Sequence, residues 1–173
     1  MEARDLLKAR PHPYQLALRI RHPSMDPAAI SHELRLVAEH SFKAGEPRKS
    51  SSGLAATSVH AESYWLATLN PTAWPTALSS FDMSFPGRPR LALGQERLQA
   101  MISDSLGAAL AICTTHFLRS HAEFVRRIQS EGGAITFIVE VAPKALNGFT
   151  LTPQTARALS DMGIAVEFEF ANG

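Results

Sequence analysis

Apolar and polar residues alternate along several stretches of the chain, which is the pattern of strands with one buried face. The first stretch alternates through four apolar residues, Tyr14, Leu16, Leu18 and Ile20. Alternation returns from Val59 to Leu69, with Trp65 on the apolar side, and again over residues 135–141 and 164–170. A brief strand over residues 40–44 brings the expected number of strands to five.

Capping residues predict two short helices between these strands. Asp26-Pro27 favours a helix start, because Asp accepts hydrogen bonds from free N–H groups and Pro at the first helical position loses none. Apolar spacing carries that helix to about Leu36. Thr152-Pro153 and Gly163 bound a second helix in the same way.

A longer helical stripe of apolar residues runs from Gln95 to Gly132-Gly133. It fits one broken helix or two consecutive helices, with Thr114-Thr115 as its weakest point. Glycine, proline and serine predict a long loop over residues 45–53. Four prolines between Asn70 and Arg90 exclude a regular element across that segment.

The order of elements predicts an α+β fold, with a single mixed or antiparallel sheet of about five strands and helices packed mainly on one face. We expect an N-terminal extension over residues 1–13 and a single domain over residues 14–173, with an irregular excursion at residues 70–94. At 173 residues and 45% hydrophobic content, the chain is long enough to bury one core.

Charge and cysteine content narrow the classes of function. Seventeen Lys and Arg against sixteen Asp and Glu give a net charge of +1, which argues against a nucleic-acid binder. The single cysteine, Cys113, excludes an intramolecular disulfide and fits a reducing compartment. The N-terminus lacks the apolar run of a signal peptide, and the longest apolar stretch, Leu106 to Cys113, is too short to span a membrane. These features predict a cytoplasmic protein.

Motifs for catalysis, metals and cofactors are missing from the sequence. His116 and His121 are five residues apart, about 140° around a helix, so they do not face one metal ion. Cys113 and His116 are spaced as a thiolate and its base, but Cys113 falls on the apolar stripe, where a buried hydrophobe is the simpler interpretation. Pro47 removes a backbone N–H that a phosphate loop would use. We therefore expect no metal and no cofactor.

The remaining candidate site is a basic cluster that could hold a carboxylate, a phosphate or an acidic partner surface. Its expected binding residues are Arg19, Arg21, Lys43, Glu46, Arg48 and Tyr64. Strand parity points Arg19 and Arg21 away from the core. The alternative is that these two arginines pair across strands with acidic residues, namely Glu62, Glu140 or Glu167.

Three runs of the sequence resemble a bacterial family catalogued as domain of unknown function 4279. They are Leu18-x-Ile20-x-His22-Pro23-x-Met25-Asp26-Pro27-x-x-Ile30-Ser31-x-x-Leu34, Lys43-Ala44-Gly45-Glu46-Pro47-Arg48 and Glu62-Ser63-Tyr64-Trp65. The resemblance covers residues 14–69, is looser over the strand at residues 135–141 and the unit at residues 151–170, and implies a bacterial origin without assigning an activity.

We therefore expect a non-enzymatic binding module, acting as a protein-interaction or immunity-type neutralising partner. The long irregular segments and the lack of catalytic motifs favour this interpretation. The alternative is a small-molecule sensor or small enzyme with a pocket between the sheet and residues 70–90, lined by Trp65 and Trp74.

Overall fold

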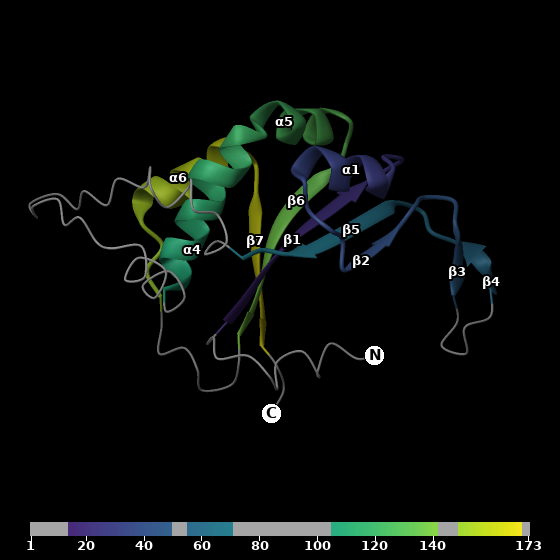
Figure 1. The fold of residues 1–173 in the computed structure, drawn as a ribbon, viewed down its shortest axis with the longest axis horizontal. Coiled ribbons are helices and arrows are strands. Elements are labelled where there is room, and N and C mark those ends of the chain that lie inside the picture. Colours follow the sequence, from purple (N-terminus) through teal and green to yellow (C-terminus); the bar gives the residue numbers. More distant parts are fainter. Residues whose placement is uncertain (1–13, 50–54, 71–104, 142–148, 171–173) are drawn as a thin grey trace, which may run out of the picture.

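The computed structural model describes residues 14–49, 55–70, 105–141 and 149–170, and a five-stranded sheet is its centre (Figure 1). Across the sheet the strands are β2 (His40–Phe42), β5 (Ser63–Thr68), β1 (Tyr14–His22), β6 (Ala134–Val141) and β7 (Ala165–Phe170). All neighbours pair antiparallel except β6 and β7, which are parallel. The sheet is therefore mixed, and the predicted α+β class is confirmed.

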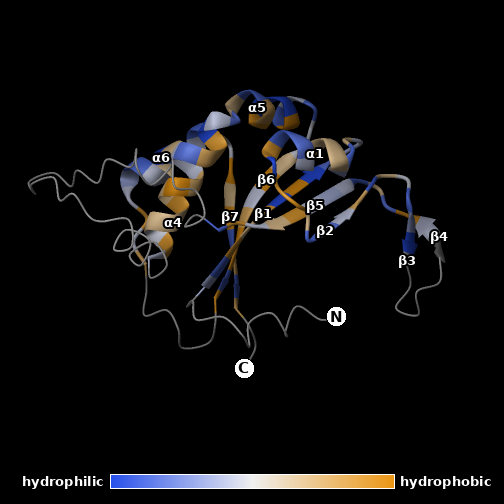
Figure 2. Cartoon of the chain, in the orientation of Figure 1, coloured by the Kyte–Doolittle hydropathy of each residue, from blue (hydrophilic) through white to orange (hydrophobic). Residues whose placement is uncertain are grey.

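The helices are α1 (Pro27–Leu34), α4 (Leu106–Ile112), the π-helical η4 (Cys113–Leu118), α5 (Ala122–Ser130) and α6 (Pro153–Asp161). Figure 1 shows α1 and α5 above the strands, with α6 and α4 to the left of them. Buried side chains of the strands, such as Trp65 and Phe137, share one core with Ile30 of α1 and Ile128 of α5. Hydropathy follows this arrangement, with α4 strongly apolar and the peripheral β3 polar (Figure 2).

The predicted weak point of the long helical stripe lies inside η4. Thr114 and Thr115 each donate a side-chain hydrogen bond to a carbonyl four residues earlier, those of Leu110 and Ala111, at 2.7 Å. Such bonds compete with the backbone ladder and loosen a helix. Within the described part of the stripe, two α-helices thus flank a π-helical segment, a form that is often found at functional sites.

Residues 45–62 differ from the prediction. In place of a loop and one continuous strand, β3 (Pro47–Lys49) and β4 (Ala55–Val59) pair in a separate two-stranded sheet. The amide of His60 donates to Glu46 O at 3.0 Å, and Gly45, with φ of 84°, donates to His60 O at 2.8 Å. This turn separates β4 from β5, so Val59 is 54% exposed and its predicted place in the core is wrong.

Candidate functional site

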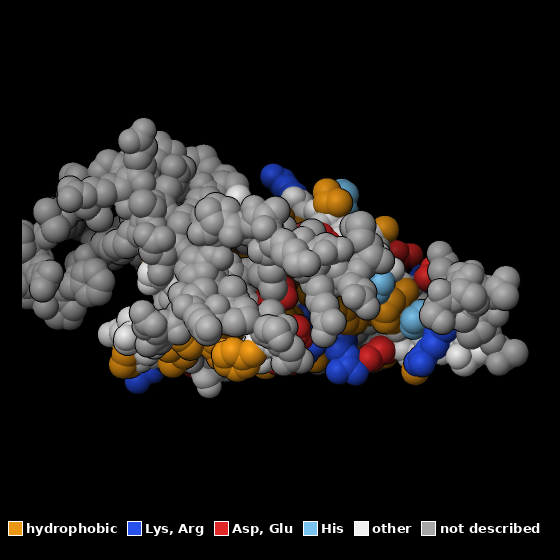
Figure 3. Space-filling view, turned by 90° about the horizontal axis from the view of Figure 1, so that it is seen from below, with side chains coloured by type: hydrophobic (Ala, Val, Ile, Leu, Met, Phe, Trp, Pro, Cys, Tyr) orange, Lys and Arg blue, Asp and Glu red, His pale blue; other side chains and the backbone are white. Residues whose placement is uncertain are grey.

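Strand register places three of the six predicted site residues, Arg19, Arg21 and Tyr64, on the sheet face opposite to Trp65, which we call the outer face. The Cα partners Phe42–Tyr64 and Tyr64–Arg21 align one row of side chains across β2, β5 and β1. Arg19 lies one row further along β1, opposite Thr136 of β6. Figure 3, which views the molecule from the side away from the helices, shows basic and acidic side chains next to each other on this face.

A cluster of rings lies at the β2 end of the outer face. The Phe42 ring is stacked between His60 and Tyr64, with centroid distances of 3.7 and 5.1 Å. His40 meets the rings of Phe42 and Tyr64 edge-on, at 5.9 and 5.7 Å. We call these four residues the ring cluster. His40 is exposed and the other three are half-buried, so the cluster is accessible from solvent.

The environment of the ring cluster raises the pKa of the Tyr64 phenol. Burial is the main cause that raises the pKa of Tyr64, while nearby Arg19 and Arg21 lower it and nearby Glu169 and Glu167 raise it. The hydroxyl therefore stays protonated at neutral pH and is a hydrogen-bond donor. Of the ring cluster, the sequence prediction included only Tyr64.

Both arginines of the outer face are ion-paired. Arg21 donates from Nε to Oε1 of Glu62 at 2.7 Å, and its Nη2 contacts the same oxygen. Arg19 reaches across β6 to pair with Glu167 of β7. The cross-strand alternative considered from the sequence is therefore the arrangement in the structure, and an acidic ligand would compete with these carboxylates.

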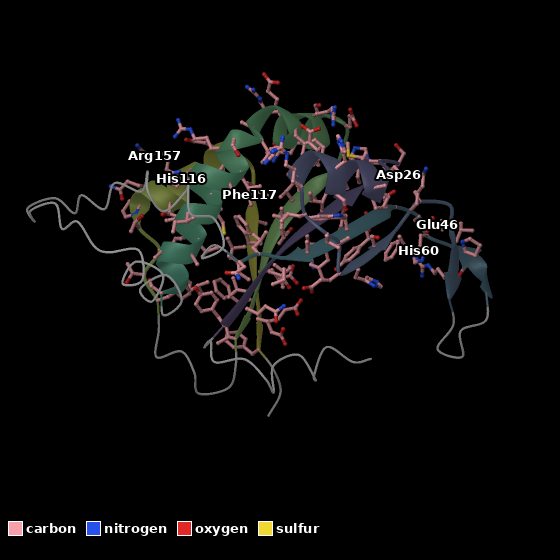
Figure 4. All side chains as sticks on the ribbon, viewed as in Figure 1. Asp26, Glu46, His60, His116, Phe117 and Arg157 are labelled. Atoms are coloured by element: carbon pink, nitrogen blue, oxygen red, sulfur yellow. The ribbon has the colours of Figure 1, made fainter. Side chains whose placement is uncertain are left out.

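Lys43 and Glu46 lie in the connection between β2 and β3. Nζ of Lys43 donates to Oδ2 of Asp26 at 2.9 Å, and the backbone amide of Lys43 donates to Glu46 at 3.0 Å. The hydrogen bond from Lys43 lowers the pKa of Asp26, and the same contact raises the pKa of Lys43. Figure 4 shows Asp26, Glu46 and His60 near one another at this end of the sheet. Arg48 is exposed on β3.

The cysteine does not have the environment of a nucleophile. Cys113 is 0% exposed, and burial raises the pKa of its thiol far above neutrality. A neutral buried thiol is a poor nucleophile. This supports the interpretation of Cys113 as a core residue.

The described residues contain neither a group of metal ligands nor a membrane-spanning helix. Among these residues, no three His, Cys, Asp or Glu side chains are grouped to hold a metal ion. In the same part of the chain, no helix is long and apolar enough to cross a bilayer.

Chelation provides a direct test of metal dependence. We expect excess EDTA to leave the melting temperature of the purified protein unchanged, because the described residues contain no group of metal ligands. If the protein did hold a structural zinc ion, its removal would cost folding free energy and lower the melting temperature. Differential scanning fluorimetry with and without chelator measures this. A large drop that added zinc restores would contradict the prediction.

Comparison with known proteins adds no relative. No family model matches the chain, and searches of curated proteins and of solved structures return no match. The functional argument therefore depends on the geometry of the outer face itself.

Proposed function

We propose that this chain is a non-enzymatic binding module that recognises a protein partner through the outer face at its β2 end. The observation that carries the proposal is the accessible ring cluster, which lies beside Arg19 and Arg21 of β1. Aromatic residues and arginine are enriched at protein interfaces and dominate their binding energy. A tyrosine that is half-buried and protonated supplies both apolar area and a hydrogen-bond donor.

The charges of this surface favour a partner with acidic groups. Arg21 is 51% exposed, so a carboxylate of a partner can approach its guanidinium beside Glu62. Arg48 is exposed on β3, and no ion pair is formed by it among the described residues. Arginine is suited to this contact because its planar group binds carboxylates through two parallel hydrogen bonds.

The rival sensor or enzyme would use residues 70–90, of which all but Asn70 lie outside the described residues. Trp65, which was expected to line that pocket, is instead 0% exposed in the core. The outer face therefore remains the better-supported site.

Charge reversal tests the proposal. We expect Arg21→Glu and Arg48→Glu to abolish capture of a partner from lysate of the native host, because each replaces a cation with a group that repels carboxylates. The melting temperature should change by no more than about 2 °C, as for surface substitutions. Quantitative mass spectrometry of captured proteins compares the variants with the wild type.

Arg126→Glu on α5 is the matched control, because it makes the same charge change at an exposed site away from the outer face. It should retain the partner. Equal capture by all four proteins, or equal loss in the control, would contradict the proposal. Arg19 is a poorer probe, since its side chain is 20% exposed and paired with Glu167, so its reversal would also alter stability.

A further inference from the structure

A second polar site lies where the end of α1 meets the start of α5. A shallow, open pocket of about 420 Å³ lies there, and of its lining residues His121 is half-buried while the others are exposed. Its lining residues are His32, Glu33, Arg35, Ser120 and His121. None of them belongs to the outer face, so this pocket is independent of the proposed function.

The donors of this pocket match an oxyanion. Arg35 supplies a guanidinium and His32 and His121 two imidazoles, whereas Glu33 is the single carboxylate. The hydroxyl of Ser120 already donates to Phe117 O at 2.6 Å, so it is not counted as a donor. A phosphate group presents several acceptor oxygens to such a set. The charges of Arg35 and Glu33 cancel, so a proton taken up by the imidazole of His121 gives the site a net positive charge.

The backbone of Arg35 supports a specific role for its side chain. Arg35 follows α1 with φ of 53° and ψ of 39°, and the amides of Arg35 and Leu36 both donate to Ser31 O. This is the helix-ending position that glycine usually occupies, because other residues are strained there. It is the only non-glycine residue with positive φ in the described part of the chain. An arginine at this position is therefore unfavourable for the backbone and places a cation at the pocket.

The surroundings of His121 disfavour its protonated form. Burial lowers the pKa of His121, Glu33 raises it, and Arg35 lowers it. The ring also meets Phe117 edge-on, with a centroid distance of 5.2 Å. A bound anion would offset the effects of burial and Arg35, so binding would be coupled to proton uptake by the imidazole.

We propose that this pocket is a binding site for a phosphate group, either as the free ion or as a small phosphomonoester. Arg35 is the principal contact, the two imidazoles complete the donor set, and Glu33 limits the positive charge of the site. Binding strengthens as the imidazole of His121 becomes protonated.

The first experiment measures inorganic phosphate binding to the full chain by NMR, using the imidazole signals of His32 and His121. We expect both signals to shift on titration. Arg35→Gly should weaken binding at least about tenfold, the effect of losing one charge-assisted hydrogen bond. The melting temperature should stay the same or rise, because glycine relieves the strained backbone. Lost binding therefore could not be attributed to unfolding.

Two further variants should differ from Arg35→Gly, because one should strengthen phosphate binding and the other should leave it unchanged. Glu33→Gln should strengthen phosphate binding severalfold, because it removes the only carboxylate of the pocket. Arg126→Gln removes one arginine from the exposed face of α5 and should leave the affinity unchanged. A titration with O-phosphoserine separates the sources, since tighter binding than inorganic phosphate assigns a monoester and weaker binding assigns the free ion.

The pH dependence is measured with sulfate, because its charge stays constant as pH falls from about 7.5 to about 5.5, the range in which imidazole protonates. We expect the affinity to increase across this range. The proposal is overturned if the wild type binds neither anion, if Arg35→Gly binds phosphate as tightly as the wild type, or if Arg126→Gln weakens binding as much as Arg35→Gly.

Discussion

Replacing Trp65 by alanine is expected to lower the free energy of unfolding by about 3–5 kcal/mol, the usual cost of deleting a buried aromatic ring. Trp65 is 0% exposed at the centre of β5, with β2 on one side and β1 on the other. Its Nε1 donates to Oγ of Ser31 at 2.9 Å, which ties the strand to α1. Urea denaturation followed by far-UV circular dichroism measures the change.

Three variants resolve the origin of this loss. Trp65→Phe keeps much of the apolar area but removes the indole donor, and Ser31→Ala removes only its acceptor, at about 1–3 kcal/mol. Val37→Ala, at a residue that is 87% exposed, should stay within about 0.5 kcal/mol of the wild type. In a Trp74→Phe background Trp65 is the single tryptophan. Emission typical of an exposed indole from that protein would refute the buried placement.

The alternation of apolar and polar residues and the helix-capping residues correctly predicted strand β1 and the starts of helices α1 and α6. The alternation through Leu16, Leu18 and Ile20 defines the buried side of β1, because strand parity depends only on neighbouring residues. Asp26 accepts from the amide of Ala28 at 2.9 Å and Thr152 from that of Thr155 at 3.2 Å, as their positions before proline predicted. Caps and alternation are properties of a few consecutive residues, which explains this success.

The candidate sites depend on contacts that local patterns do not contain. Phe42 meets Tyr64 only because β2 pairs with β5, and Arg19 meets Glu167 across 148 residues of sequence. The spacing of His40 and Phe42 was compatible with one strand face, but nothing in the sequence identified the neighbouring strand. Arg35 was equally unpredictable, since glycine is the usual signal for a left-handed helix end.

One of the seven histidines, His22, has a structural role that could not be predicted from the spacing of histidines in the sequence. Its side chain is 3% exposed at the end of β1. Nδ1 accepts from the amides of Ser24 and Met25 at 3.1 and 2.8 Å, so the ring holds the connection that leads into α1. Nε2 lies 3.1 Å from Oε2 of Glu131, without the alignment of a hydrogen bond. The accepting Nδ1 carries no proton, which assigns the hydrogen to Nε2.

We therefore expect His22→Leu to lower the free energy of unfolding by about 2–4 kcal/mol, although leucine keeps the apolar volume. The loss arises because the amides of Ser24 and Met25 remain without their acceptor in a partly buried turn. His22→Asn should recover at least about half of it, because an Asn side chain accepts from the amide two residues later. Urea denaturation gives both values, and hydrogen exchange at the two amides should accelerate in His22→Leu and much less in His22→Asn. Equal stability of the leucine variant and the wild type would show that the ring contributes by volume alone.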